Sequence, residues 1–223
     1  MAQQIQTSMI EYKVNGEKAS GYEAKPEGAG PFPGVVVIME WWGLEPHIKD
    51  VTERFAREGY YAVAPDIYHG KITGDPGEAM NLGRSLDRNL AVKEIDTAIR
   101  HIKAQPVSNR KVGVIGYCMG GGLALLTAIY SDNVDAVNPY YGGNPNPIDL
   151  VERIQCPILG LYAEHDEANR PSVPDIEAAL RRYGKQFECI VYSDAPHAFF
   201  NDTRETYREE ASKLSFRAEE RRG

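Results

Sequence analysis

Short hydrophobic runs alternate with amphipathic stretches along most of the 223-residue chain. The hydrophobic runs have the length of strands and are bounded by glycine, proline or polar residues; they span residues 35–39, 60–64, 111–117, 134–140, 157–163 and 186–192. The first run is apolar throughout, which is typical of a strand that is buried on both faces. The pattern therefore predicts a series of strands separated by other elements.

The amphipathic stretches predict helices between these strands, because apolar residues recur in them every three or four positions. The predicted helices cover residues 46–58, 90–104, 123–130 and 173–183. A further charged helix is expected from about Thr203, with Tyr207, Ala211 and Leu214 facing inward. The helix at 123–130 has apolar or small residues almost all round and is therefore expected to be buried.

Regular alternation of strands and helices predicts an α/β fold with a mostly parallel central sheet and helices on both faces. At the start of the chain, residues 10–24 read as two short strands around Asn15-Gly16, a good signal for an antiparallel hairpin. No linker-like tract, repeat or break in composition interrupts the sequence. We therefore predict one domain over residues 1–223.

Charge and composition narrow the function classes. The formal net charge is −7, from 25 Lys and Arg against 32 Asp and Glu residues, which argues against a protein built to hold nucleic acid. No apolar run approaches the roughly 20 residues of a membrane span, and the first residues lack the pattern of a secretory signal. The three cysteines are widely spaced, as expected for free thiols in a reducing compartment. We predict a cytoplasmic protein.

The strongest chemical motif is Gly116-Tyr117-Cys118-Met119-Gly120, at the point where a predicted strand meets a predicted helix. This is the cysteine form of the G-x-S-x-G nucleophile elbow, in which a strained turn holds the nucleophile above the sheet. The helix N-terminus behind it favours a thiolate and an oxyanion. A glycine-rich packing turn with an incidental cysteine is the alternative interpretation; a dinucleotide-binding G-x-G-x-x-G pattern does not fit.

Two further residues make the elbow part of a larger arrangement. Asp166 follows the predicted strand 157–163, and His197 follows the predicted strand 186–192. The order nucleophile, acid, histidine is that of α/β-hydrolases, and the carboxyl ends of parallel strands meet at one edge of the sheet. Taken singly, the aspartate could be a turn former and the histidine a surface residue. His165 is a rival histidine, but a residue adjacent to the acid cannot readily lie between acid and nucleophile.

These residues resemble the dienelactone hydrolase family, the cysteine branch of the α/β-hydrolase fold, also known by its carboxymethylenebutenolidase activity. The motifs that carry the resemblance span residues 36–43, 64–68, 113–121 and 196–199, so that it covers nearly the whole chain. Matched by motif, the family's catalytic triad falls on Cys118, Asp166 and His197. The same match implies that Glu40 contacts the resting thiol and keeps it protonated until substrate arrives.

The resemblance also suggests how a substrate would be held. The backbone N–H groups of Trp41 and Met119 would form an oxyanion hole. Trp41 would also line an apolar mouth, together with Trp42 and Phe199. The family's dienelactone-cleaving members hold the substrate carboxylate with two arginines, and the matching positions here are Pro76 and Asn201. Two arginines near these positions, Arg84 and Arg204, are therefore the candidate substrate-binding residues.

The main hypothesis is hydrolysis of small esters or lactones through a Cys-His-Asp triad and a thioester acyl-enzyme. One alternative keeps the site but changes the substrate to uncharged short-chain carboxylic esters or thioesters. A third hypothesis is a non-catalytic redox sensor that uses Cys118 as an oxidisable thiol. Glu164, His165 and Asp166 have no second ligand cluster, so we expect no metal and no cofactor. The expected partner is a small-molecule ester or lactone, with no nucleic acid or membrane, and the chain a monomer or weak homodimer.

Overall fold

A computed structural model describes residues 3–14 and 16–220 of the chain, with side chains up to Phe216. The strands of the structure, in chain order, are β1 (Ile5–Val14), β2 (Glu17–Pro26), β3 (Phe32–Ile38), β4 (Tyr61–Pro65), β5 (Ser108–Tyr117), β6 (Ala136–Tyr140), β7 (Ile158–His165) and β8 (Phe187–Pro196). The helices are α1 (Pro46–Arg57), α2 (Pro76–Ser85), α3 (Arg88–Ala104), α4 (Met119–Tyr130), η1 (Ile148–Arg153), η2 (Arg170–Ser172), α5 (Val173–Arg182) and α6 (Glu209–Glu220).

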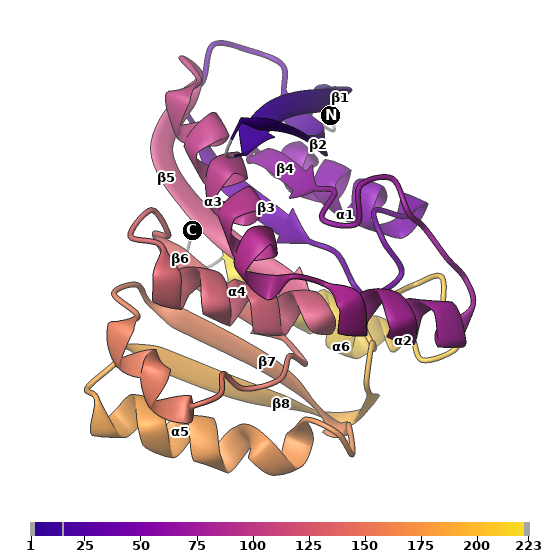
Figure 1. Cartoon of the computed structure of the whole chain (residues 1–223), viewed down its shortest axis with the longest axis vertical. Helices are drawn as coiled ribbons and strands as arrows, with labels where there is room; N and C mark the ends of the chain where they lie inside the picture. Colours follow the sequence, from indigo (N-terminus) through magenta and orange to yellow (C-terminus); the bar gives the residue numbers. More distant parts are fainter. Residues whose placement is uncertain (1–2, 15, 221–223) are drawn as a thin grey trace.

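These strands form one eight-stranded sheet in the order β1-β2-β4-β3-β5-β6-β7-β8. The strands from β4 to β8 pair in parallel, whereas β1 and β2 form an antiparallel hairpin that joins the sheet beside β4. Helices cover both faces: α3 and α4 lie in front of the sheet in Figure 1, and α6 lies behind it. The predicted α/β architecture with its N-terminal hairpin is confirmed.

The strand and helix predictions differ from the structure mainly at their ends. The hairpin is longer than predicted, since β1 begins at Ile5 and β2 ends at Pro26. Val14 pairs with Glu17 across the turn; Asn15, half of the turn signal, lies outside the described residues. The start of α1 at Pro46 is confirmed, because a proline at the first helical position needs no N–H partner.

Helix α2 was missed by the sequence analysis. Its apolar stripe is weak, and only Ala79 is buried in it. The helix is recognisable instead by its start, where Asp75 accepts a hydrogen bond from the backbone N–H of Glu78 and Pro76 occupies the first turn. Asp87 caps α3 in the same way, through Asn89 and Leu90. Capping residues therefore mark this pair of helices better than hydrophobic periodicity does.

The last helix was predicted too early and partly with the wrong face inward. It begins at Glu209, so Tyr207 lies in the preceding loop, where the segment 198–208 makes turns rather than helical bonds. Ala211 is buried as predicted, but 48% of Leu214 is exposed. Besides Ala211, the buried residues of this helix are Ser212 and Ser215. The buried face of the helix therefore differs from the predicted one.

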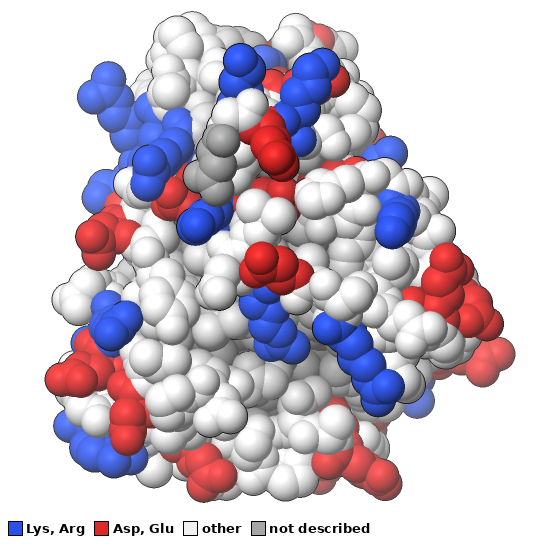
Figure 2. All heavy atoms as spheres, viewed as in Figure 1, with Lys and Arg blue, Asp and Glu red and all other residues white. Residues whose placement is uncertain are grey.

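The surface seen in Figure 2 has acidic and basic side chains dispersed over it, and neither sign covers this face. None of the helices in the described ranges is both long and apolar enough to cross a membrane. The chemistry of the protein therefore has to be sought in the arrangement of particular side chains. Four strands of the sheet matter most for that arrangement.

Strands β3, β5, β7 and β8 run in the same direction and end at the same edge of the sheet. Glu40 lies two residues after β3, Cys118 directly after β5, Asp166 directly after β7 and His197 directly after β8. Parallel pairing therefore brings together four residues that are up to 157 positions apart in the sequence. This edge is where ligand sites form in open parallel sheets.

A buried carboxylate joins the hairpin to the parallel part of the sheet. Glu23 on β2 is 6% exposed and accepts hydrogen bonds from Tyr61 on β4 and from His101 on α3, the latter at 3.3 Å. Lys25 also lies 3.2 Å from its second oxygen. Burial alone would raise the pKa of Glu23, but these hydrogen bonds outweigh it and lower the pKa to about 2.

Because its pKa is lowered, Glu23 stabilises the fold above its ordinary pKa of about 4.5, and this contribution is lost as the pH falls towards about 2. We expect Glu23→Gln to lower the free energy of unfolding by roughly 3 kcal/mol at pH 7, the equivalent of the shift, and by little near pH 2. Urea denaturation at both pH values measures the difference. Glu11→Gln, at an exposed carboxylate on β1, is the control with an expected change under about 1 kcal/mol. An equal loss for Glu23→Gln at both pH values would contradict the prediction.

Candidate active site

Cys118 occupies a strained turn between β5 and α4. Its backbone has φ 57° and ψ −116°, a conformation that a residue with a side chain adopts only at a cost. Two backbone hydrogen bonds hold the turn: the N–H of Cys118 donates to Tyr140 at 3.1 Å, and the N–H of Gly121 donates to Cys118 at 3.0 Å. The predicted elbow geometry is therefore present, with the thiol at the N-terminus of a helix.

The glycines around Cys118 are required by the close approach of three backbone segments. A Cβ at Gly116 would lie 2.0 Å from the carbonyl oxygen of Gly120. A Cβ at Gly120 would lie 2.6 Å from the carbonyl oxygens of both Ile38 and Met39 at the end of β3. Neither backbone can move aside easily, so only glycine fits. These contacts lock the elbow against β3 and thereby fix the position of Cys118 at the sheet edge.

Asp166 and His197 form a hydrogen-bonded pair beside this turn. The Nδ1 atom of His197 lies 2.7 Å from Oδ2 of Asp166, which is 2% exposed. The other carboxylate oxygen accepts the backbone N–H groups of Ala168 and Asn169 at 3.2 and 3.1 Å, and the Asn169 amide donates to Oδ2 at 3.0 Å. Burial alone would raise the pKa of Asp166, but the hydrogen bonds from His197 and Asn169 hold it below its ordinary value.

The ionised carboxylate in turn determines the state of His197. Since it can only accept, Nδ1 carries the proton, which leaves Nε2 of a neutral imidazole as an acceptor. Burial lowers the pKa of His197, but the hydrogen bond with Asp166 and the neighbouring Cys118 raise it to about 10. His197 can therefore take up a proton near the thiol and keep it as an imidazolium.

The structure has a pocket of about 370 Å³ whose wall includes Cys118 and His197. Another pocket, of about 390 Å³, lies elsewhere on the sheet, and its wall includes none of Cys118, Asp166 and His197. The residues that line the pocket at Cys118 come from several loops and helices: Trp41, Met80, Gly83, Arg84, Arg88, Cys118, Met119, Tyr141, Gly143, Asn169 and His197. Met119 is the first residue of α4, where a backbone N–H has no acceptor within the helix. The pocket therefore contains the two residues, Trp41 and Met119, that the sequence analysis assigned to an oxyanion hole.

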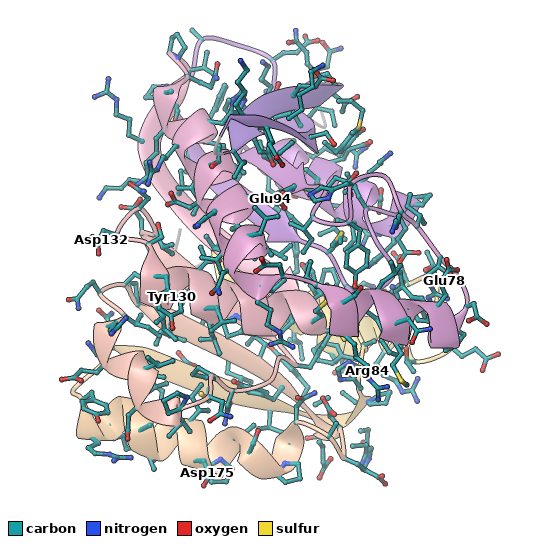
Figure 3. All side chains as sticks on the ribbon, viewed as in Figure 1. Glu78, Arg84, Glu94, Tyr130, Asp132 and Asp175 are labelled. Carbon is teal, nitrogen blue, oxygen red and sulfur yellow. The ribbon has the colours of Figure 1, made fainter. Side chains whose placement is uncertain are left out.

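Only one of the four candidate substrate-binding residues lies in the wall of this pocket. Arg84, labelled on α2 in Figure 3, lines the pocket. Arg204 does not: its guanidinium lies 4.1 Å above the ring of Trp42 and 3.4 Å from Glu45. Trp42, on which Arg204 stacks, is likewise absent from the pocket wall. The placement of Phe199 at the mouth was wrong, since it is fully buried against Tyr140, Tyr141 and Tyr192.

The sequence analysis missed six pocket residues, three of which have polar side chains: Arg88, Tyr141 and Asn169. Arg88 follows Arg84 by four residues in the sequence but lies on the next helix, at the start of α3. Asn169 could have been recognised from its spacing of three residues after Asp166, which is typical of a local turn that satisfies a carboxylate. Tyr141 packs against the ring of His197 at 5.0 Å between centroids, and nothing in its sequence context distinguishes it from the core tyrosines. The rival His165 is exposed and lies beside Asp194.

Glu40 is buried behind the pocket and has an unusual environment for a carboxylate. It is 1% exposed, and its Oε2 accepts a hydrogen bond from the amide of Asn201 at 2.6 Å. Its Oε1 has no hydrogen-bond partner among the described residues. Burial, offset in part by the Asn201 hydrogen bond, raises the pKa of Glu40 to about 7. The hydrogen bond is thus to Asn201, whereas the family resemblance implies a contact with the thiol.

One group of possible metal ligands occurs among the described residues, namely Glu164, His165 and Asp194. All three are exposed, and their ligand atoms lie within 4.8 Å of one another. The cluster lies at the surface outside the pocket wall. It adds no group to the chemistry at Cys118.

An elbow residue at the carboxyl edge of a mostly parallel sheet, with a histidine and an acid from two later strands beside it, defines the class of α/β-hydrolases. The comparisons with known proteins agree and are more specific. The model of the Dienelactone hydrolase family matches residues 19–220. The chain belongs to this family and is a hydrolase of the kind that acts on esters and lactones.

Individual relatives cover most of the chain. "Protein usf" of Aquifex pyrophilus is 39% identical over 88% of this chain and 88% of its own length. A "Putative carboxymethylenebutenolidase" of Saccharolobus solfataricus is 33% identical over 92% of this chain and 93% of its own. A crystal structure titled "Putative Dienelactone Hydrolase" from Klebsiella pneumoniae has a TM-score of 0.84 and 29% identity, covering 97% of both chains.

The close backbone packing at the elbow leads to a matched pair of predictions. Gly120→Ala places a methyl group against the carbonyl oxygens of Ile38, the last residue of β3, and of Met39, and is expected to lower the free energy of unfolding by about 2 kcal/mol or more. Gly122→Ala, two residues later in α4, has its nearest contact at 3.4 Å and is expected to change it by less than about 1 kcal/mol. Chemical denaturation of both variants measures the difference. Equal changes in the free energy of unfolding for the two variants would show that the backbone around Gly120 can shift to accept a methyl group.

Proposed function

We propose that the protein hydrolyses small esters or lactones by acyl transfer to Cys118, with His197 as the general base and acid and Asp166 as the residue that orients it. The observation that carries this proposal is the 2.7 Å hydrogen bond between His197 and Asp166 next to a thiol on a strained turn. The pair supplies a base with the right tautomer, and the turn supplies an accessible nucleophile.

The reaction proceeds in two steps. His197 accepts the proton of the Cys118 thiol while sulfur bonds to the carbonyl carbon, and the oxyanion is bound by the backbone N–H groups of Trp41 and Met119. Collapse of this intermediate breaks the bond to the leaving oxygen, which takes the proton from His197. A water molecule then gives a proton to His197 and attacks the thioester, which releases the carboxylic acid and returns the proton to the thiol.

Of the three thiols, Cys118 has the environment that a nucleophile requires. Burial raises the pKa of Cys156 to about 11 and that of Cys189 to about 12, so that neither readily forms a thiolate. The same values count against the redox-sensor hypothesis, since a resolving cysteine has to react as a thiolate. Hydrolysis is therefore the better use of the site.

Replacement of the nucleophile gives the direct test. Cys118→Ala is expected to lower the hydrolysis rate of p-nitrophenyl acetate and of a dienelactone by about a thousandfold or more, because no covalent intermediate forms. Cys189→Ala removes a partly buried thiol outside the pocket and should leave both rates unchanged. The test is to measure the steady-state hydrolysis rates of the wild type, Cys118→Ala and Cys189→Ala. Full activity of Cys118→Ala would refute the proposal.

We further propose that the substrate carries a carboxylate or a similar anionic group. Arg84 and Arg88 both line the pocket, and no ion pair of either is found among the described residues. A guanidinium matches a carboxylate in shape and charge. They lie on the α2 and α3 side of the pocket, so the anion would be held there and the scissile bond beside Cys118. This arrangement favours charged lactones over the uncharged esters of the alternative hypothesis.

A pair of substrates separates these alternatives. Arg88→Gln is expected to raise KM for a carboxylated lactone by about tenfold and to leave KM for p-nitrophenyl acetate unchanged, because only the first has an anion to lose. Arg100→Gln, on the same helix but paired with Asp96 at the surface, is the control. Equal KM changes for both substrates, or none, would assign the site to uncharged esters.

A further inference from the structure

Helix α2 places a glycine in the wall of the pocket. Gly83 lines the pocket together with Met80 and Arg84, which lie on the same face of the helix. The helix continues to Ser85 and ends at Leu86 in an extended conformation, so Gly83 is helical and does not serve as the terminal glycine. Glycine inside a helix is less favourable than alanine, because it loses more backbone freedom on folding. Its presence at this position therefore needs a separate reason.

Backbone packing does not supply that reason. A Cβ at Gly83 would lie 3.6 Å from the hydroxyl of Tyr68 and 3.8 Å from the sulfur of Met119, which are ordinary van der Waals distances. At Gly116 and Gly120, by contrast, a Cβ would lie 2.0 and 2.6 Å from backbone carbonyl oxygens. The fold thus excludes alanine at the elbow and accepts it at position 83. What the missing side chain changes is the space inside the pocket.

This space lies beside the nucleophile elbow. Met119 directly follows Cys118, and its sulfur accepts a hydrogen bond from the Tyr68 hydroxyl at 3.3 Å. A methyl group at Gly83 would touch both of these side chains, and Met119 lines the pocket as Gly83 does. The absence of that methyl group therefore widens the pocket next to the residue that follows the nucleophile.

The chemistry of the reaction assigns this space to one part of the substrate. The leaving oxygen takes its proton from His197 and therefore has to lie on the His197 side of Cys118. That side of the pocket is formed by Tyr141, whose ring centroid is 5.0 Å from that of His197, and by Asn169, whose amide nitrogen is 3.4 Å from Nδ1. The acyl group is bonded to the other side of the carbonyl carbon, and it is left with the side at Gly83.

We propose that Gly83 is a specificity-determining residue: the space left by its missing side chain receives the acyl group of the substrate. The substrates are then esters or lactones whose acyl group is cyclic or branched and thus wider than a short linear chain. The proposal rests on the proposed function, which places the carbonyl carbon at Cys118, and adds the shape of the substrate to it. It is independent of the anionic group that Arg84 and Arg88 would bind.

Two uncharged esters with the same leaving group test this shape. Gly83→Ala is expected to lower kcat/KM for p-nitrophenyl benzoate by about tenfold, because the added methyl group takes the place of part of the ring. For p-nitrophenyl acetate, kcat/KM should change by less than about twofold, since its acyl group does not reach the added methyl group. The same substitution should raise the Tm by about 2 to 4 °C, because alanine favours the helix. A higher Tm would show that the selective loss does not come from damage to the fold.

Two further variants make the outcome specific. Asn81→Ala introduces alanine at an exposed position of the same helix outside the pocket wall, and it should leave kcat/KM for both esters unchanged. Gly83→Ser adds a side chain of similar size but different polarity. It should reproduce the selective loss seen with Gly83→Ala, because the proposal depends on the volume at this position.

Equal changes in kcat/KM for the two esters in Gly83→Ala, or no change for either, would overturn the proposal. A wild type that hydrolyses the acetate but not the benzoate would do so too, since the space would then admit no wide acyl group. Both outcomes leave acyl transfer to Cys118 intact. Failure of the proposed function has a different signature, namely equal rates of p-nitrophenyl acetate hydrolysis by the wild type and Cys118→Ala, and it would overturn both proposals.

Discussion

The close packing of backbone at the end of β5 is the constraint on which the rest of the site depends. Gly116 and Gly120 allow β5, the start of α4 and the end of β3 to approach within distances that no side chain would permit. The approach forces Cys118 into a strained conformation and directs its side chain away from the packed backbone. The close backbone packing at Gly116 and Gly120 therefore determines where the Cys118 thiol lies and which way it points. The other polar groups of the site are arranged around this thiol.

Those polar groups come from strand ends whose spacing is a property of the sheet. Because β3, β5, β7 and β8 pair in parallel, a residue just after each strand lies at one edge whatever the length of the intervening chain. Loops and helices then differentiate the positions. The turn after β7 satisfies Asp166 with Asn169, and the loop after β8 returns Asn201 to Glu40. Local hydrogen bonds thus determine the chemistry of groups that the sheet only brings close.

The sequence predicted the features that are encoded locally and missed those that depend on contacts between distant segments. The elbow, Asp166 and His197 were predictable because glycine spacing and strand ends are visible in the residues themselves. Asn201 appeared only as a departure from the family's arginine, since its partner Glu40 is 161 positions away. Phe199 was placed wrongly because it lies two positions after a site histidine, and this spacing does not show whether an aromatic side chain lines a pocket or is buried. In the structure it packs against three tyrosines. Helix α2, with little buried surface, gave too weak a pattern to detect.

The two buried carboxylates at the site show how the same chemical group acquires different roles. Asp166 receives backbone and side-chain donors on both oxygens, so the pKa of this carboxylate lies below its ordinary value and its charge is constant at neutral pH. Glu40 receives one donor from Asn201 and leaves an oxygen without a hydrogen-bond partner among the described residues, so that burial prevails and its pKa is about 7. A permanent anion suits the orientation of His197, which has to hold one tautomer throughout turnover. An acid with a pKa near neutrality responds instead to the charges around it, which for Glu40 are Glu45, His197 and Arg204. The number of hydrogen-bond donors around each carboxylate therefore separates a structural charge from a responsive one.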